Sequence, residues 1–122
     1  MEIIARDAVA PVQAPDGAIV RELASPQNSG LTRHSLAEIT HPAGTTSEAH
    51  YHRQAEEVYY VLSGRGGVRI DGQTQSIGPS DTVVILPGQR HQVWQEGDTD
   101  LVLLVTCVPA YSLDDVVSAP EA

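Results

Sequence analysis

Short apolar segments separated by turn signals make up most of the chain, and amphipathic periods of helical length are almost absent. The segments are rich in Val, Ile, Leu, Thr and Tyr, and pairs such as Asp71-Gly72, Gly78-Pro79 and Pro87-Gly88 punctuate them. Turns spaced by roughly eight to twelve residues are typical of an all-β sandwich or barrel. We therefore predict strands over residues 18–23, 31–40, 50–52, 57–62, 67–70, 73–75, 82–86, 91–95 and 101–108.

The sharpest local signal is the Asp71-Gly72 pair, which lies between segments 67–70 and 73–75. A two-residue loop of this kind needs a positive φ at both positions and closes a tight hairpin whose twist matches that of its strands. We therefore expect these two segments to pair directly with one another.

Segments 58–62 and 83–86 are apolar at consecutive positions, so both of their faces are apolar. Such strands suit a filled barrel or a sheet that contacts a second subunit. We expect a homodimer, with the N-terminal residues 2–9 in a shared sheet or a swapped strand.

The chain is predicted to be one domain, with a barrel over about 18–112. An N-terminal arm over 1–15 and a flexible tail over 114–122 are predicted at its ends, because both ends are rich in Ala, Pro, Asp and Glu.

The charge balance narrows the possible partners. Seven Lys and Arg residues stand against 16 Asp and Glu residues, for a net charge of −9. This balance argues against binding to nucleic acid or to an anionic membrane surface. The single cysteine, Cys107, excludes an internal disulfide. The start of the chain does not resemble a signal peptide, and the longest apolar run, 101–105, is far too short to span a membrane, so we expect a cytoplasmic protein.

Two histidines and a nearby glutamate suggest a metal site. His50 and His52 lie two positions apart, so on a strand their imidazoles share one face, with Cα atoms about 6–7 Å apart. Glu57 begins a buried apolar segment, where a carboxylate is costly unless a charge or a metal pairs it. Glu56 is the alternative ligand. Residues 53–56 are predicted to form a polar connection, so the alternation of side chains along a strand does not tell which of the two glutamates faces the histidines. We favour Glu57 and expect Glu56 to be solvated.

A third histidine, His91, opens a predicted strand just after the Pro87-Gly88 turn, a position that suits the rim of a cavity. The other two histidines, His34 and His41, are expected to be surface or strand-filling residues.

Two spaced motifs in the chain resemble those of the cupin superfamily. The first matches at every spaced position, and the second departs from the family at Ser80, Leu86 and Gln95, where Gly, Pro and Asn are usual. The two segments read Gly44-x5-His50-x-His52-x4-Glu57-x6-Gly64 and Ser80-Asp81-x4-Leu86-x-Gly88-x2-His91-x3-Gln95.

The resemblance implies a jelly-roll barrel, the double-stranded β-helix of a small single-domain cupin, with one divalent metal ion in its mouth. The family's ligands carry over to His50, His52, Glu57 and His91. Such a donor set leaves two adjacent octahedral positions open. We expect iron first, with zinc, manganese or nickel as alternatives.

The alternation of side chains along a strand predicts which residues lie next to this site. Tyr59 lies two positions after Glu57, so it is predicted to face the metal as a substrate contact or a general acid or base, the alternative being a structural barrel tyrosine. Val93 and Gln95 share the face of His91 and are predicted to line the substrate pocket. The alternative for Gln95 is a role in a turn network.

These features predict an enzyme, a dioxygenase-like oxygenase that acts on a small, chelating, oxygen-rich molecule. One alternative is a metal-dependent isomerase or lyase, and another is a barrel that binds a small molecule without turnover. The fold alone does not separate them, because one fold hosts many activities.

Overall fold

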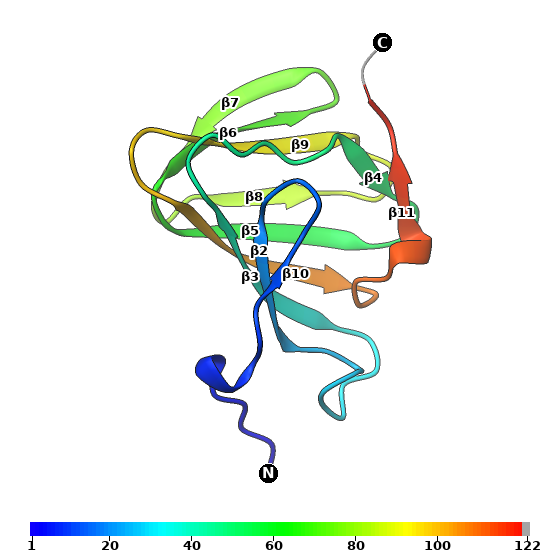
Figure 1. Cartoon of the computed structure of the whole chain (residues 1–122). Coiled ribbons are helices and arrows are strands. Elements are labelled where there is room, and N and C mark those ends of the chain that lie inside the picture. Colours follow the sequence, from blue (N-terminus) through cyan, green and yellow to red (C-terminus); the bar gives the residue numbers. More distant parts are fainter. Residues whose placement is uncertain (121–122) are drawn as a thin grey trace.

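The computed structural model describes residues 1–120 and contains two antiparallel β-sheets that face one another (Figure 1). The six-stranded sheet has the order β1-β2-β3-β10-β5-β8, and the five-stranded sheet has the order β11-β4-β9-β6-β7. The first sheet comprises β1 (Val12–Gln13), β2 (Ile19–Ala24), β3 (Ser35–His41), β10 (Leu101–Val108), β5 (Glu56–Ser63) and β8 (Thr82–Ile85). The second comprises β11 (Val116–Ser118), β4 (His50–His52), β9 (His91–Glu96), β6 (Arg65–Ile70) and β7 (Gln73–Ile77).

The predicted all-β jelly-roll barrel is therefore confirmed. Within residues 1–120, the helices are single 3-10 turns, Arg6–Ala8 and Leu113–Asp115, and none has the length and apolar character that a membrane crossing requires.

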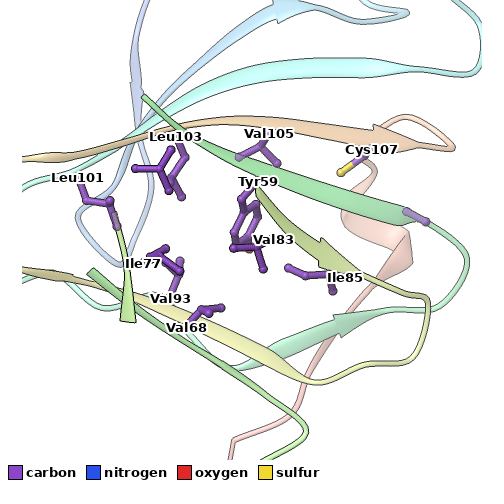
Figure 2. Close-up of a cluster of buried hydrophobic side chains, with 12 residues drawn as sticks. Tyr59, Val68, Ile77, Val83, Ile85, Val93, Leu101, Leu103, Val105 and Cys107 are labelled. Carbon is purple, nitrogen blue, oxygen red and sulfur yellow. The ribbon is translucent and has the colours of Figure 1, made fainter. Parts of the chain in front are cut away.

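The core lies between the two sheets. Burial alternates along β9 and β10, so every second side chain points inward, as the period of a strand requires. Leu103 and Val105 from β10 meet Tyr59 from β5 and Val93 from β9 in this space (Figure 2). These four side chains are at most 5% exposed, and they fix the separation of the sheets that carry the site.

The hairpin between β6 and β7 has the predicted form. Asp71 and Gly72 have φ angles of 47° and 84°, and Ile70 pairs directly with Gln73. Positive φ at both loop positions is the backbone conformation that the Asp-Gly pair was expected to adopt.

Both chain ends contain a short strand. The flexibility predicted for the tail over 114–122 stays a prediction, and the last two residues of the tail lie outside the described residues. Within the expected arm, β1 pairs with β2, and within the expected tail, β11 pairs with β4. The physical reason is that β4 has an open edge, whose backbone groups need partners that Val116–Ser118 supply.

The N-terminal arm lies against its own chain. The Arg6 guanidinium contacts the Glu38 carboxylate at 2.8 Å, and Arg21 Nη1 donates to the Val9 carbonyl oxygen at 2.6 Å. On the outer face of the six-stranded sheet, large apolar side chains are exposed, among them Tyr60 and Val84. These strands therefore carry apolar side chains on both faces, as the sequence indicates. The homodimer stays a prediction.

Ser80 occupies the left-handed region, with a φ of 72°, at the position where the cupin motif usually has glycine. A non-glycine residue there is strained by about 1–2 kcal/mol, which exceeds the entropic cost of about 0.5–1 kcal/mol that glycine adds. We therefore predict that Ser80→Gly raises the free energy of unfolding by about 0.5–1 kcal/mol, measured by urea denaturation. Ser76→Gly, on strand β7, is the matched control and should destabilise the protein. A Ser80→Gly variant less stable than the parent would contradict this account.

Candidate metal centre

Four side chains from three strands converge at one end of the barrel. The ligand atoms of His50, His52, Glu57 and His91 all lie within 4.8 Å of one another. His50 and His52 come from β4 and His91 from β9, while Glu57 comes from β5 in the opposite sheet. The cluster therefore bridges the two sheets, and it contains all four ligands that the sequence predicted.

The strand pairing explains this convergence. His50 lies directly opposite His91 in the β4–β9 pair, and their ring centroids are 4.3 Å apart. His52, two positions along β4, stays on the same side, with its ring centroid 5.3 Å from that of His50. The i, i+2 spacing thus supplies two neighbouring imidazoles, as predicted.

The structure decides between the two glutamates. Glu57 is 5% exposed, and its Oε1 lies 3.1 Å from His91 Nε2 and 3.5 Å from His52 Nε2. Glu56 is exposed to solvent. Of the two glutamates, only Glu57, whose side chain points inward from β5, reaches the histidines.

The free atoms of the cluster fit a divalent cation. His52 Nε2, His91 Nε2 and Glu57 Oε1 are buried without a hydrogen-bond partner among the described residues. Buried polar atoms are rarely left so, because an unsatisfied one costs about 1–3 kcal/mol. Imidazole nitrogens with one carboxylate oxygen are a donor set that suits iron, zinc, nickel and manganese. A cation at this point would satisfy all three orphaned atoms at once.

Backbone carbonyls orient two of the imidazoles. His50 Nδ1 lies 2.7 Å from the Glu48 carbonyl oxygen, and His91 Nδ1 lies 2.9 Å from the Gln89 carbonyl oxygen. A carbonyl only accepts, so each Nδ1 carries a proton, which leaves Nε2 as the nitrogen that can present a lone pair to a cation. This is the arrangement that a metal-ligating histidine requires.

The charges at the cluster are coupled. Burial acts to raise the pKa of Glu57, but its contacts with His52 and His91 outweigh burial and hold that pKa well below its usual range. Burial acts to lower the pKa of His52, but Glu57 and then Asp115 raise it above its ordinary value. Burial, the largest influence on His50, lowers the pKa of that imidazole. The site therefore holds an ionised carboxylate ready to ligate.

Cys107 holds the other oxygen of the ligand carboxylate. It lies opposite Glu57 in the β10–β5 pair, and its Sγ donates to Glu57 Oε2 at 3.3 Å. Burial and the Glu57 charge raise the pKa of the Cys107 thiol, which therefore stays protonated as a donor. This contact was not predicted from the sequence, because the pairing of β10 with β5 has no local signal there.

Tyr59 and Val93 lie between the sheets, as strand parity predicted. Tyr59 is 5% exposed, and its ring centroid is 6.3 Å from that of His91. Val93 is 2% exposed and belongs to the apolar core. Both side chains share the interior with the metal cluster. Their contact with a substrate stays a prediction.

Gln95 takes part in a loop network. Its Oε1 accepts from the Gly44 amide at 3.0 Å, and its Nε2 lies within 3.0 Å of the carbonyl oxygens of Glu96, Gly97 and Thr99. These contacts lie at the end of β9 away from His91, about 13 Å along the strand. Of the two roles predicted for Gln95, the turn network is the one seen, and the substrate contact stays untested.

An open groove of about 820 Å³ runs between the edge strands β7 and β8. Its floor includes the core residues Val68, Ile77 and Val83, and its rim includes polar side chains such as Gln75 and Thr82. The groove also reaches Gln89, the residue whose carbonyl oxygen orients His91. The groove therefore reaches a residue that neighbours the cluster.

Comparison with known proteins places the chain in a family. A profile of the cupin domain matches residues 37–107, a span that contains all four clustered ligands. The uncharacterized protein MJ1618 of Methanocaldococcus jannaschii is 35% identical over 109 residues, which are 89% of this chain and 87% of that protein. The tetracenomycin polyketide synthase protein TcmJ of Streptomyces glaucescens is 28% identical over 95 residues, 78% of this chain and 63% of that protein.

The fold is also similar to that of solved structures. The polyketide cyclase RemF from Streptomyces resistomycificus superposes with a TM-score of 0.83 at 23% identity, over 100% of this chain and 87% of that one. The profile match, the two-sheet barrel and the three-histidine, one-glutamate cluster agree, and the chain belongs to the cupin domain family.

Proposed function

We propose that this cupin is a metal-dependent enzyme that converts a small, chelating, enolisable carbonyl compound by non-redox chemistry, such as cyclisation, isomerisation or elimination. The observation that carries the proposal is the cluster of His50, His52, Glu57 and His91. Its atoms His52 Nε2, His91 Nε2 and Glu57 Oε1 are buried and lack a hydrogen-bond partner among the described residues. A divalent cation held by these residues would supply Lewis acidity, which would polarise a carbonyl oxygen and acidify the adjacent C–H bond.

Tyr59 is the hydrogen-bond donor in this proposal. Burial, followed by the Glu57 charge, raises the pKa of the phenol well above its ordinary value. The hydroxyl therefore stays protonated at neutral pH, where it can donate a hydrogen bond to a substrate oxygen but does not act as a base.

The walls around Tyr59 favour a substrate with an apolar body. Val68, Val83 and Val93 line the interior and exclude water, which strengthens polar interactions at the site. The groove between β7 and β8 provides the route of entry in this proposal, because Val68 and Val83 line it together with Gln89, whose carbonyl oxygen lies beside His91. An enolisable carbonyl compound with a hydrocarbon or aromatic body matches this lining.

The named relatives support non-redox chemistry ahead of oxygenation. TcmJ is named for polyketide synthesis and RemF for polyketide cyclisation. Chains with alternating carbonyl groups are both chelating and enolisable, so a cation site next to a buried phenol suits their ring closure. The oxygenase expected from the sequence is the second candidate, favoured by a donor set in which four protein ligands leave room for both substrate and dioxygen.

Metal content and oxygen consumption test the proposal together. Untagged protein purified without added metal is analysed by elemental mass spectrometry and then incubated with a 1,3-diketone, a 2-hydroxy acid and a catechol. We expect about one cation per chain and spectral conversion of the diketone with no oxygen uptake. Uptake of oxygen in proportion to substrate consumed would replace the proposal by the oxygenase. Saturable binding without conversion by the metal-loaded protein would leave a binding barrel.

A further inference from the structure

The C-terminal segment is built into the metal centre. Strand β11 runs antiparallel to β4, with Val116 opposite His52 and Ser118 opposite His50 (Figure 1). The Arg53 amide donates to the Asp115 carbonyl oxygen at 2.9 Å, just beyond the end of β4. The strand that carries two of the four ligands is thus held along its outer edge by residues 115–118.

The Asp115 carboxylate holds the loop that joins His52 to Glu57. Its Oδ1 accepts from the Gln54 amide at 2.8 Å, and its Oδ2 accepts from the Ala55 amide at 3.1 Å. Asp115 Oδ2 also lies 3.8 Å from His52 Nδ1, with only 1% of the His52 side chain and 16% of the Asp115 side chain exposed. One carboxylate therefore contacts both the ligand loop and the ring of a ligand.

His52 differs from the other two ligand histidines in its outer partner. The Nδ1 atoms of His50 and His91 lie within hydrogen-bond distance of backbone carbonyl oxygens, at 2.7 and 2.9 Å. His52 Nδ1 is buried and, in the described chain, has no hydrogen-bond partner. A ligating imidazole nearly always donates its other N–H to an oxygen, and a carboxylate is a frequent acceptor. Asp115 stands where that acceptor is needed.

We infer that Asp115 is the positioning residue for His52: its carboxylate accepts the Nδ1–H, which fixes the tautomer that presents Nε2 to the cation. A shift of about 1 Å brings the pair to hydrogen-bond distance. The inference rests on the proposed metal site and extends it, because it makes the C-terminal segment a part of that site. It also explains why a charged side chain is kept against a buried ring.

Asparagine at this position removes the charge of Asp115 at nearly constant shape. An Asp115→Asn side chain keeps one oxygen, which can accept from one of the two loop amides, but it loses the second acceptor and the charge that stabilises a donating imidazole. Asp114→Asn is the matched control, because Asp114 contacts Arg53 through its backbone carbonyl oxygen at 2.8 Å. Zinc affinity is measured by competition with a chromophoric chelator, at a temperature where circular dichroism shows each variant to be folded.

We expect Asp115→Asn to weaken zinc binding about 10- to 100-fold and Asp114→Asn to leave it unchanged. A purely structural role would lower the melting temperature of the zinc-free protein without changing the affinity of the folded form, and wild-type affinity in Asp115→Asn would overturn the inference. Failure of the wild-type protein itself to bind zinc, iron, manganese or nickel would instead overturn the metal centre. The two failures are therefore distinct.

A measurement on the wild-type protein covers the case in which Asp115→Asn does not fold. Long-range 1H–15N NMR of the zinc-loaded protein reports which ring nitrogen of each histidine carries the proton. The inference requires a His52 Nδ1–H that is protected from exchange with water. A His52 ring with its proton on Nε2, or an Nδ1–H that exchanges as fast as that of an exposed histidine, would overturn it.

Discussion

Replacing His52 by alanine abolishes stoichiometric metal binding while the β-sheets remain folded. The imidazole is 2% exposed, and its Nε2 lies 3.5 Å from Glu57 Oε1 at the centre of the cluster. Loss of an outer partner alone weakens metal binding about 10- to 100-fold, so loss of a direct ligand weakens it by more than about 100-fold. Equilibrium dialysis with elemental mass spectrometry measures the metal retained per chain, and far-ultraviolet circular dichroism reports the strands.

His34→Ala is the control for His52→Ala, because His34 is exposed and outside the cluster. It should retain the metal content of the parent protein. If His52→Ala kept the same metal per chain as His34→Ala, the assignment of His52 as a ligand would be wrong.

Glu57→Gln has the second large effect, through loss of charge at nearly constant shape. Three neutral imidazoles do not compensate a buried divalent cation, and Glu57 contributes the only carboxylate of the described cluster. We expect metal affinity to fall more than about 100-fold in Glu57→Gln and to stay unchanged in Glu56→Gln, since Glu56 is exposed. A comparable loss in Glu56→Gln would mean that the structure assigns the wrong glutamate.

The same substitution changes how the stability of the metal-free protein depends on pH. The pKa of Glu57 is lower in the folded protein than in the unfolded chain, where a glutamate carboxyl has a pKa of about 4.3. Its contribution to the free energy of unfolding is therefore present above about pH 4.3 and is lost as the pH falls through the folded pKa. The pKa of His52 is higher in the folded protein than in the unfolded chain, where it is about 6.5. Its contribution to the free energy of unfolding is therefore present below about pH 6.5 and is lost as the pH rises through the folded pKa.

The metal-free wild-type protein should therefore gain stability from this pair mainly between about pH 4.3 and pH 6.5. In Glu57→Gln this part of the profile should flatten, because both shifts depend on the Glu57 charge. Urea unfolding across this range, with a chelator present, measures the effect. Parallel profiles for the two proteins would show that the pair does not couple to folding.

The sequence by itself determined most of the strands, the hairpin and the four candidate ligands. The alternation of apolar residues that predicts a strand can be recognised from neighbouring positions in the sequence. The same is true of the Asp71-Gly72 pair, whose two residues adopt a positive φ. The histidine pair was also a local signal, because side chains two positions apart on a strand share a face. Glu57 and His91 needed the spacing of the cupin motifs, since neither lies next to the pair in the sequence.

Only the tertiary structure decided which distant segments meet. The pairing of β10 with β5 places Cys107 against Glu57, and the pairing of β11 with β4 places Asp115 beside His52. These residues are 50 and 63 positions apart along the chain, a separation over which strand pairing leaves no periodic trace. The spacing of residues in the sequence thus identifies the candidate ligands, and the carbonyl groups that orient His50 and His91 are also local. The contacts of Cys107 with Glu57 and of Asp115 with His52 instead depend on long-range pairing, because a sheet edge accepts whichever strand completes its hydrogen bonds.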